Sequence, residues 1–386
     1  MIIRRYAVFV LAAAVLALFA AACSNDDSGG PAAPEELTTC ISVSAGENHT
    51  LAVDSDGRLW AWGHNRYGQL GDGTWEDSNV PVPVGHDTDW KSVSAGNHFS
   101  VAVKHNGTLW AWGINNKGQL GTGLPVGCNA PVQVGNDGDW KAVSAGASFV
   151  AALKDDGSLW TWGDNSMGQL GDGTLVDVYA PHRVGGEKDW AEVSAGSTHC
   201  VAVKKDGSLW AWGDSRLGQL GEGLSAVPRA TPVRIGGEND WVHVSAGWGH
   251  TLAIRKDGSL WAWGDNSHGQ IGDGTTAARP SPVMVSPASW KGISAGYQFS
   301  VGILHDGSLW AWGDNSYGQL ADGTKTQSVE PVREVSGSPW SFASAGRQHA
   351  IAIRNDGTAW VWGANWYGQL GDGTMTDSPV PLGLTF

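Results

Sequence analysis

The chain has 386 residues, of which 56 are glycine and 23 are tryptophan, and it carries 38 acidic against 24 basic side chains. Its formal charge of −14 at pH 7 becomes −16 when Arg4 and Arg5 are removed with the N-terminal segment. Such an acidic chain repels a phosphate backbone and gives no basic patch, so the composition excludes nucleic acid as the expected partner.

Residues 1–22 have the features of a secretory signal. Arg4 and Arg5 precede an apolar run over 7–22, which is shorter than the about 20 residues of a membrane-spanning helix. The run ends in AAAC, and Cys23 stands where the lipobox of bacterial lipoproteins has its lipidated cysteine, although leucine is commoner than Ala20. Ordinary signal cleavage beside an unrelated cysteine is the alternative.

Residues 23–36 follow as a polar segment with Pro and Gly, which is typical of a flexible tether. We therefore expect an exported protein of the cell envelope, at the outer membrane or the cell surface. The lipid on Cys23 would be its one membrane contact.

Residues 37–386 contain seven units of about 50 residues. One marker is a Leu-Trp step, with Ala-Trp in the last unit, which begins at residues 59, 109, 159, 209, 260, 309 and 359. A second marker, Ser-Ala-Gly (SAG), begins at residues 44, 94, 144, 194, 245, 294 and 344. The units differ in length by no more than one residue from 50, so they predict seven copies of one structural element.

Each unit has four strand-like runs, which in the first unit are Ser42–Ala45, Thr50–Val53, Leu59–Trp62 and Val80–Val84. Asp56-Gly57 lies between the second and third runs, and an Asp-Gly or Asn-Gly pair recurs there in every unit. Such a pair between apolar runs predicts a tight hairpin. Proline recurs in the fourth run, and because proline lacks a ladder donor, this strand is expected at the sheet edge.

A pair of tryptophans two residues apart occupies the third run of every unit, as in Trp60 and Trp62. Residues two apart share one face of a strand, and Leu59 and Ala61 occupy the other face. A sheet that is apolar on both faces needs cover on both. Seven four-stranded sheets arranged radially, each packed on the next, meet this need, so the sequence predicts an all-β, seven-bladed β-propeller. The tryptophans are interpreted as packing residues rather than a ligand box.

Repeated Gly, Asp and Asn residues follow the tryptophans and are expected to form turns. Asp164, Asn165 and Ser166 could supply oxygen ligands to calcium, but the spacing does not match a complete EF-hand loop. We therefore expect neither a metal nor another cofactor.

One repeat position alternates between His and Phe, which predicts a packed structural role for the histidines over a metal or catalytic site in the channel. Its occupants are His49, Phe99, Phe149, His199, His250, Phe299 and His349. The cysteines after Cys23 are Cys40, Cys128 and Cys200, and they show no metal-ligand spacing. Whether any two of them form a disulfide stays open from sequence.

The ordered motifs SAGxxH, the hairpin Asp-Gly, LWAWG and GQLGDGT resemble the repeat of the regulator of chromosome condensation family over Ile41–Phe386. The resemblance implies a seven-bladed propeller, whereas the adjacent-glycine signature of kelch repeats is absent. It also implies that the two chain ends share a blade, while the complete units allow each to form its own blade. In both cases Ile41–Val43 and Leu382–Phe386 should lie close together.

The resemblance implies two different activities. The eukaryotic founder of the family is a guanine-nucleotide exchange factor for a nuclear GTPase and binds chromatin, using a projecting insertion in one blade. This chain is acidic, carries an export signal and has units too regular for such an insertion, so exchange activity rests on fold analogy alone. Secreted bacterial relatives, including a β-lactamase inhibitor protein, bind other proteins through loops on one face. That class fits the export signal.

Antiparallel order places the SAG loops and the loops after the tryptophan pairs on one face of the propeller. Large aromatic and arginine side chains gather there in units five, six, seven and one, and such residues are typical of interface hot spots. Side chains that fold inward to cap the blades are the alternative. The candidate binding residues are Arg66, Tyr67, Trp248, Tyr297, Tyr317, Arg347, Trp366 and Tyr367.

The sequence as a whole predicts a non-enzymatic binding or scaffold protein, lipid-anchored and exported. Its expected partner is a protein of the envelope or the extracellular space. A carbohydrate ligand is the alternative, because exposed Trp and Tyr rings also stack on sugars. An enzyme with its site in the central channel is the third hypothesis, although no nucleophile–base pair is recognisable.

Overall fold

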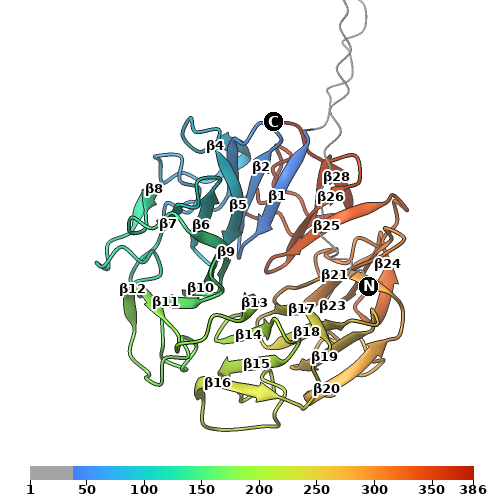
Figure 1. The fold of residues 1–386 in the computed structure, drawn as a ribbon. Coiled ribbons are helices and arrows are strands. Elements are labelled where there is room, and N and C mark those ends of the chain that lie inside the picture. Colours follow the sequence, from blue (N-terminus) through green and yellow to red (C-terminus); the bar gives the residue numbers. More distant parts are fainter. Residues whose placement is uncertain (1–37) are drawn as a thin grey trace, which may run out of the picture. The chain divides into compact units, whose positions relative to one another are not determined.

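The computed structural model describes residues 38–386, and the predicted signal segment, Cys23 and tether lie outside the described residues. Residues 38–386 form seven four-stranded antiparallel sheets arranged as the blades of a propeller (Figure 1). The predicted all-β, seven-bladed fold is confirmed. Within this part of the chain no helix has the length and apolar character needed to cross a membrane.

The first blade consists of β1 (Cys40–Ala45), β2 (His49–Asp54), β3 (Leu59–Gly63) and β4 (Ser78–Pro83). The second to fourth blades consist of β5 (Trp90–Ala95), β6 (Phe99–Lys104), β7 (Leu109–Gly113), β8 (Cys128–Gln133), β9 (Trp140–Ala145), β10 (Phe149–Lys154), β11 (Leu159–Gly163), β12 (Val178–Arg183), β13 (Trp190–Ala195), β14 (His199–Lys204), β15 (Leu209–Gly213) and β16 (Arg229–Ile235). The fifth to seventh blades consist of β17 (Trp241–Ala246), β18 (His250–Arg255), β19 (Leu260–Gly264), β20 (Arg279–Ser286), β21 (Trp290–Ala295), β22 (Phe299–Leu304), β23 (Leu309–Gly313), β24 (Ser328–Arg333), β25 (Trp340–Ala345), β26 (His349–Arg354), β27 (Ala359–Gly363) and β28 (Ser378–Gly383).

Each repeat unit forms one whole blade, with strand order 1-2-3-4 from the inner to the outer edge. The proline-bearing fourth strand is an edge strand, as predicted. β4 begins two residues before the predicted run and ends before Val84, whose N–H still donates to the Leu59 carbonyl at 2.9 Å. The pairing of β3 with β4 shifts register between Ala61 and Gly63, and this irregularity accounts for the difference between the predicted and the observed bounds of β4.

The SAG motif joins every blade to its neighbour. The Ala95 N–H donates to the Ser44 hydroxyl of the preceding blade at 3.0 Å, and the equivalent bond forms at all seven junctions within residues 38–386. The third position of the motif must be glycine, because a Cβ on Gly46 would lie 2.7 Å from the Gly96 carbonyl oxygen and 2.6 Å from the His49 ring. Thus serine supplies the inter-blade acceptor, and glycine permits the close approach.

The tryptophan pairs lie between blades. The second member of each pair is fully buried, and its indole N–H donates to the glutamine carbonyl in the GQ loop of the preceding blade, as Trp112 does to Gln69 at 2.8 Å. All seven pairs in the described chain make this bond. The first member is half-buried. The interpretation of the tryptophans as packing residues is confirmed.

The alternating His and Phe residues pack between blades, with a matching partner in the next blade. His49 Nε2 lies 2.9 Å from the Ser100 hydroxyl, which in turn donates to the Gln69 carbonyl at 2.8 Å. Ser100 therefore accepts from the imidazole, so the ring is the neutral Nε2–H tautomer. The three other histidines pair in the same way with Thr251, Ser300 and Thr50. Where phenylalanine replaces histidine, the facing residue is Val150, Cys200 or Ala350.

The ring closes through contacts between the chain ends, and the ends share no four-stranded sheet. Thr39 and Thr358 form an isolated β-bridge, and the Thr38 N–H donates to the Leu384 carbonyl at 3.0 Å. Val43 and Leu384 belong to one apolar cluster, so the expected proximity of the ends is confirmed. The shared blade implied by the family resemblance is not formed, because each unit carries all four strands.

Phe386 fills a gap in the first blade. In the second blade Trp90 packs against Trp110 and Trp112 with ring centroids 6.1 and 6.2 Å apart. The first blade has Cys40 in the place of that tryptophan, and the Phe386 ring lies 5.0 Å from Trp60 and 5.8 Å from Trp62 instead. The C-terminal aromatic ring therefore completes the core of the blade that contains the N-terminal strand.

Replacing Phe386 by Ala should destabilise the ring at its closure. Because the ring packs on two tryptophans and is only partly buried, we expect a loss of roughly 2–3 kcal/mol in the free energy of unfolding, measured by urea denaturation. Met375→Ala, which removes an exposed side chain of the last blade, serves as the control. Equal stability of the two variants would show that closure does not depend on Phe386.

The buried histidines should make stability fall as the pH is lowered. Burial depresses the pKa of His199, His250 and His349 to about 3, and that of His49 well below its usual 6.5. Below about pH 6.5 the unfolded chain takes up protons that the folded chain excludes. Each such histidine then lowers the free energy of unfolding by about 1.4 kcal/mol per pH unit until the folded pKa is reached.

A paired exchange tests this dependence. His49→Phe combined with Ser100→Val reproduces the pair found at Phe99 and Val150, so it should preserve the fold. Urea denaturation between pH 6 and pH 4 should show a loss about 1.4 kcal/mol per pH unit smaller than in the unaltered protein. An identical pH dependence in both proteins would contradict neutral burial of His49.

Candidate interaction surface

The loops that carry the candidate residues meet at one end of the propeller, here called the SAG face. The loops between first and second strands surround the mouth of the central channel, where the seven Ala-Gly-X segments line a depression of about 110 Å³. The position X differs in every unit. Its occupants are Glu47, Asn97, Ala147, Ser197, Trp248, Tyr297 and Arg347.

An inner row of side chains crosses four neighbouring blades on this face. The rings of Trp248 and Tyr297 lie 4.8 Å apart with an interplanar angle of 30°. The Arg347 guanidinium lies over Tyr297, 5.3 Å from the ring centroid, and forms an ion pair with Glu47. Each member therefore holds the next, and the row runs from the fifth blade to the first.

The row continues outward over the first and second blades. Glu47 Oε2 lies 3.2 Å from His98 Nε2, and the His98 ring stacks on Tyr67 with centroids 4.7 Å apart. Next to Tyr67, the His64 ring lies 4.6 Å from that of Tyr367 in the last blade. We call the row from Trp248 through Arg347 to Tyr67 and Tyr367 the aromatic arc.

Burial favours the neutral form of both histidines of the arc. Burial is the largest influence on both and lowers the pKa of His64 and of His98, although Glu47 acts in the opposite direction on each. The Gln69 amide donates to His64 Nδ1 at 2.8 Å, which also favours the unprotonated nitrogen. The exposed Arg66 carries a nearby positive charge that further lowers the pKa of His64.

Tyr317 and Trp366 form a separate pair at the edge of the arc. Their ring centroids lie 4.5 Å apart at an interplanar angle of 88°, so the edge of one ring meets the face of the other. Trp366 is 46% exposed, and Tyr67 and Trp248 are 41% and 37% exposed. Among the predicted residues, Trp248, Tyr297 and Arg347 contact one another and Tyr317 contacts Trp366, whereas Tyr67 and Tyr367 are joined to the arc through histidines.

Arg66 is exposed and is not part of these contacts. The exposed fractions of Tyr67, Trp248 and Trp366 show that these rings are not fully turned in as blade caps.

The opposite side of the SAG face has a different character. Blades two to four carry Asn97, Ala147 and Ser197 around the mouth. Lys117 Nζ lies 3.3 Å from Asp164 and 3.1 Å from Asp177, and these hydrogen-bonded carboxylates raise the pKa of the lysine. This side carries small residues and paired charges, whereas the arc is built mainly of aromatic side chains.

Sequence reasoning selected eight residues but missed three that link them, namely Glu47, His64 and His98. A signal for His64 was present, because four other units have Asp at its position. In those units the carboxylate accepts from the loop, as Asp164 does from the Gln169 amide at 2.8 Å, and His64 Nδ1 replaces it in the first unit. A departure from the repeat at a turn position therefore marked a buried residue that supports the exposed rings of the arc.

The other candidate sites considered in the sequence are a metal site and the three cysteines of the propeller. Within residues 38–386, no cluster of His, Cys, Asp and Glu has an arrangement that could hold a metal ion. Cys40, Cys128 and Cys200 are all free thiols, which answers the open disulfide question for the described chain. Burial raises the pKa of Cys40 to about 12.

Comparison with known proteins places these observations in a family. The profile of the RCC1-like domain matches residues 126–385. Profiles of the regulator of chromosome condensation repeat match residues 56–103 and, separately, 40–69 and 90–119. The matches thus extend over all seven blades.

Short stretches resemble larger eukaryotic proteins. The human E3 ubiquitin-protein ligase HERC2 is 50% identical over 44 residues, which is 11% of this chain and 1% of that protein. The ultraviolet-B receptor UVR8 of Arabidopsis thaliana is 48% identical over 42 residues, 11% of this chain and 10% of the receptor. This chain therefore spans only a small part of these relatives.

Solved structures agree in fold. Human WBSCR16 superimposes with a TM-score of 0.76 at 22% identity, covering 85% of this chain and 94% of that one. Prp20p of Saccharomyces cerevisiae gives 0.71 at 21% identity, covering 82% and 83%. At such identities the likeness shows the fold alone. Because the RCC1-like profile matches well over half of the residues, this chain belongs to the family of regulator of chromosome condensation repeat proteins.

Proposed function

We propose that the protein is a non-enzymatic binding protein, exported and lipid-anchored, that recognises a partner protein through the aromatic arc. The observation that carries this proposal is the continuous contact from Trp248 through Tyr297 and Arg347 to the first blade. Rigid aromatic rings and arginine held by neighbours lose little conformational freedom on binding, which is why they dominate interfaces.

Features outside the arc support the same proposal. The propeller is a rigid frame that spaces loops from seven blades on one face. Prp20p has the same fold, and its structure was described together with its binding to Gsp1p and histones. The predicted export signal and the predicted lipidation of Cys23 favour an extracellular or envelope partner. Guanine-nucleotide exchange is not proposed, since the likeness to Prp20p supports the fold alone.

A carbohydrate ligand is the second candidate, favoured by the Tyr317–Trp366 pair. The two rings meet edge to face, so Tyr317 covers at most one face of the indole, and Trp366 is 46% exposed. An open indole face suits a sugar ring. Such a ligand would depend on this pair and be indifferent to Trp248 and Arg347.

Loss of the arc should abolish capture of the partner. Soluble residues 24–386 serve as bait for envelope and secreted fractions, beside a variant with four aromatic residues of the arc, Tyr67, Trp248, Tyr297 and Tyr367, changed to Ala. We expect at least a hundredfold loss of affinity, since hot-spot residues contribute about 2 kcal/mol or more each. The affinity for the captured protein is measured by biolayer interferometry.

The matched control changes four exposed apolar residues outside the arc, Trp75, Leu124, Leu175 and Leu224, to Ala. Both variants must melt as the unaltered protein does. A partner held equally by all three proteins would exclude the arc as its site. Capture of no protein, together with glycan-array binding lost on Trp366→Ala, would replace the proposal by the carbohydrate candidate.

Lipidation of Cys23 is tested separately in cells. We expect an alkyne-labelled fatty acid to be incorporated into the unaltered protein and not into Cys23→Ser, and the serine variant to leave the membrane fraction. Cys128→Ser, which changes a thiol within the propeller, is the control. Equal labelling of the Cys23 variant would contradict the lipid anchor.

A further inference from the structure

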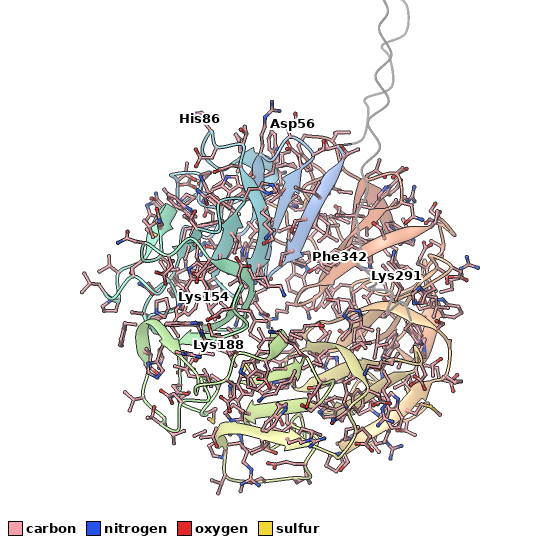
Figure 2. All side chains as sticks on the ribbon, in the orientation of Figure 1. Asp56, His86, Lys154, Lys188, Lys291 and Phe342 are labelled. Atoms are coloured by element: carbon pink, nitrogen blue, oxygen red, sulfur yellow. The ribbon has the colours of Figure 1, made fainter. Side chains whose placement is uncertain are left out.

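A second cavity lies along the inner strands, and its lining begins two residues before the alanines that line the SAG depression. Its volume is about 240 Å³, and its lining comes from the inner strands β13, β17, β21 and β25 and from β22. Each of these four inner strands begins with tryptophan and ends with the alanine of SAG. Most of the residues that line the cavity on these strands lie nearer the tryptophan, whereas the SAG depression lies at the alanine. Lys291 and Phe342, labelled in Figure 2, lie on the neighbouring strands β21 and β25.

Gly292 adds room to the cavity because it has no side chain. At this repeat position the other six units carry Ser42, Ser92, Ala142, Glu192, His243 and Phe342. No heavy atom lies within 4 Å of the position that a Cβ on Gly292 would take, and its backbone is not in the left-handed region. The glycine is therefore required neither by the backbone nor by a close neighbour, and its place is empty space.

One wall of the cavity is apolar. Ile293, Val301 and Ile303 of the sixth blade line it, together with Phe342 of the seventh. Phe342 is 50% exposed, although it lies in the channel wall. A phenyl ring that is open toward a cavity favours a ligand with an apolar or aromatic body.

The lining also includes His243 and Lys291, two residues whose side chains can donate hydrogen bonds to an anion. Glu192 accepts from the Val244 N–H at 3.3 Å and from His243 Nδ1 at 3.2 Å, so both its oxygens are engaged. The hydrogen bond to Glu192 raises the pKa of His243, which favours the imidazolium. Within residues 38–386, neither His243 Nε2 nor Lys291 Nζ has a hydrogen-bond acceptor.

We propose that this cavity binds a small carboxylic acid with an apolar body. Its carboxylate accepts hydrogen bonds from His243 Nε2 and Lys291 Nζ, and its body lies against Phe342 and Ile293. The size agrees, because an engineered cavity of about 150 Å³ holds benzene, and drug-sized sites begin near 300 Å³. One aromatic ring with a short acid chain therefore fits about 240 Å³.

The test uses 3-(4-fluorophenyl)propionate as a probe, with binding to the purified protein followed by ¹⁹F NMR titration. Gly292→Leu fills the cavity without backbone strain, and Ala142→Leu places the same side chain at the same repeat position in the third blade. We expect at least a tenfold loss of affinity for Gly292→Leu and none for Ala142→Leu, with equal melting temperatures. No binding to the unaltered protein, or equal binding to both variants, would overturn the proposal.

The head group is tested by a change in ligand and by a change in protein. We expect 3-(4-fluorophenyl)propanol, which lacks the carboxylate, to bind at least fivefold more weakly than the acid. Lys291→Ser should weaken the acid and leave the alcohol unchanged. If the alcohol binds as well as the acid, or if Lys291→Ser affects both equally, the carboxylate assignment is wrong. The arc variant should bind the acid as the unaltered protein does, which separates this site from the SAG face.

Discussion

The inner strands of the propeller meet through one repeated contact, in which the serine of each SAG motif accepts a hydrogen bond from the alanine N–H of the next blade. This contact recurs at all seven junctions of the described chain, including the junction from Ser344 back to Ala45. Because deviations in the spacing between blades would add up around a closed ring, each junction must have the same spacing. The glycine beside the contact sets that spacing, because any side chain there would strike the carbonyl of the next blade.

Residues that pack across a junction differ between units only together with their partner in the next blade. Residues outside the junctions differ from unit to unit independently. His49 faces Ser100, whereas Phe99 faces Val150, so polarity is kept on both sides of a junction. The position after SAG takes no part in the repeated junction contact, and there the units diverge into the rings and charges of the arc. The same logic applies to Gly292, which meets nothing and leaves a cavity.

Much of the fold could be predicted because the sequence repeats its own constraints. Tryptophans at alternate positions, the Asp-Gly turns and the edge prolines each recur in every unit, and all three proved to be where the pattern placed them. The proximity of the chain ends was predicted, but the packing of Phe386 was not, because this residue occurs once and its role depends on Cys40 being too small for the site. The arc was predicted in part. His98 could not be predicted because side-chain stacking across blades has no periodic signature, whereas His64 was marked only by its departure from the aspartate of four other units.

The SAG junction is tested most directly by adding one methyl group to it. In Gly196→Ala the new Cβ would lie 2.5 Å from the Gly247 carbonyl oxygen and 2.6 Å from the His199 ring, whereas in Gly186→Ala it would meet nothing within 4 Å. We predict that urea denaturation will show Gly196→Ala to be less stable by about 2–3 kcal/mol, with Gly186→Ala close to the unaltered protein. Equal stability of the two variants would contradict the claim that the spacing of the blades is set at the SAG glycine.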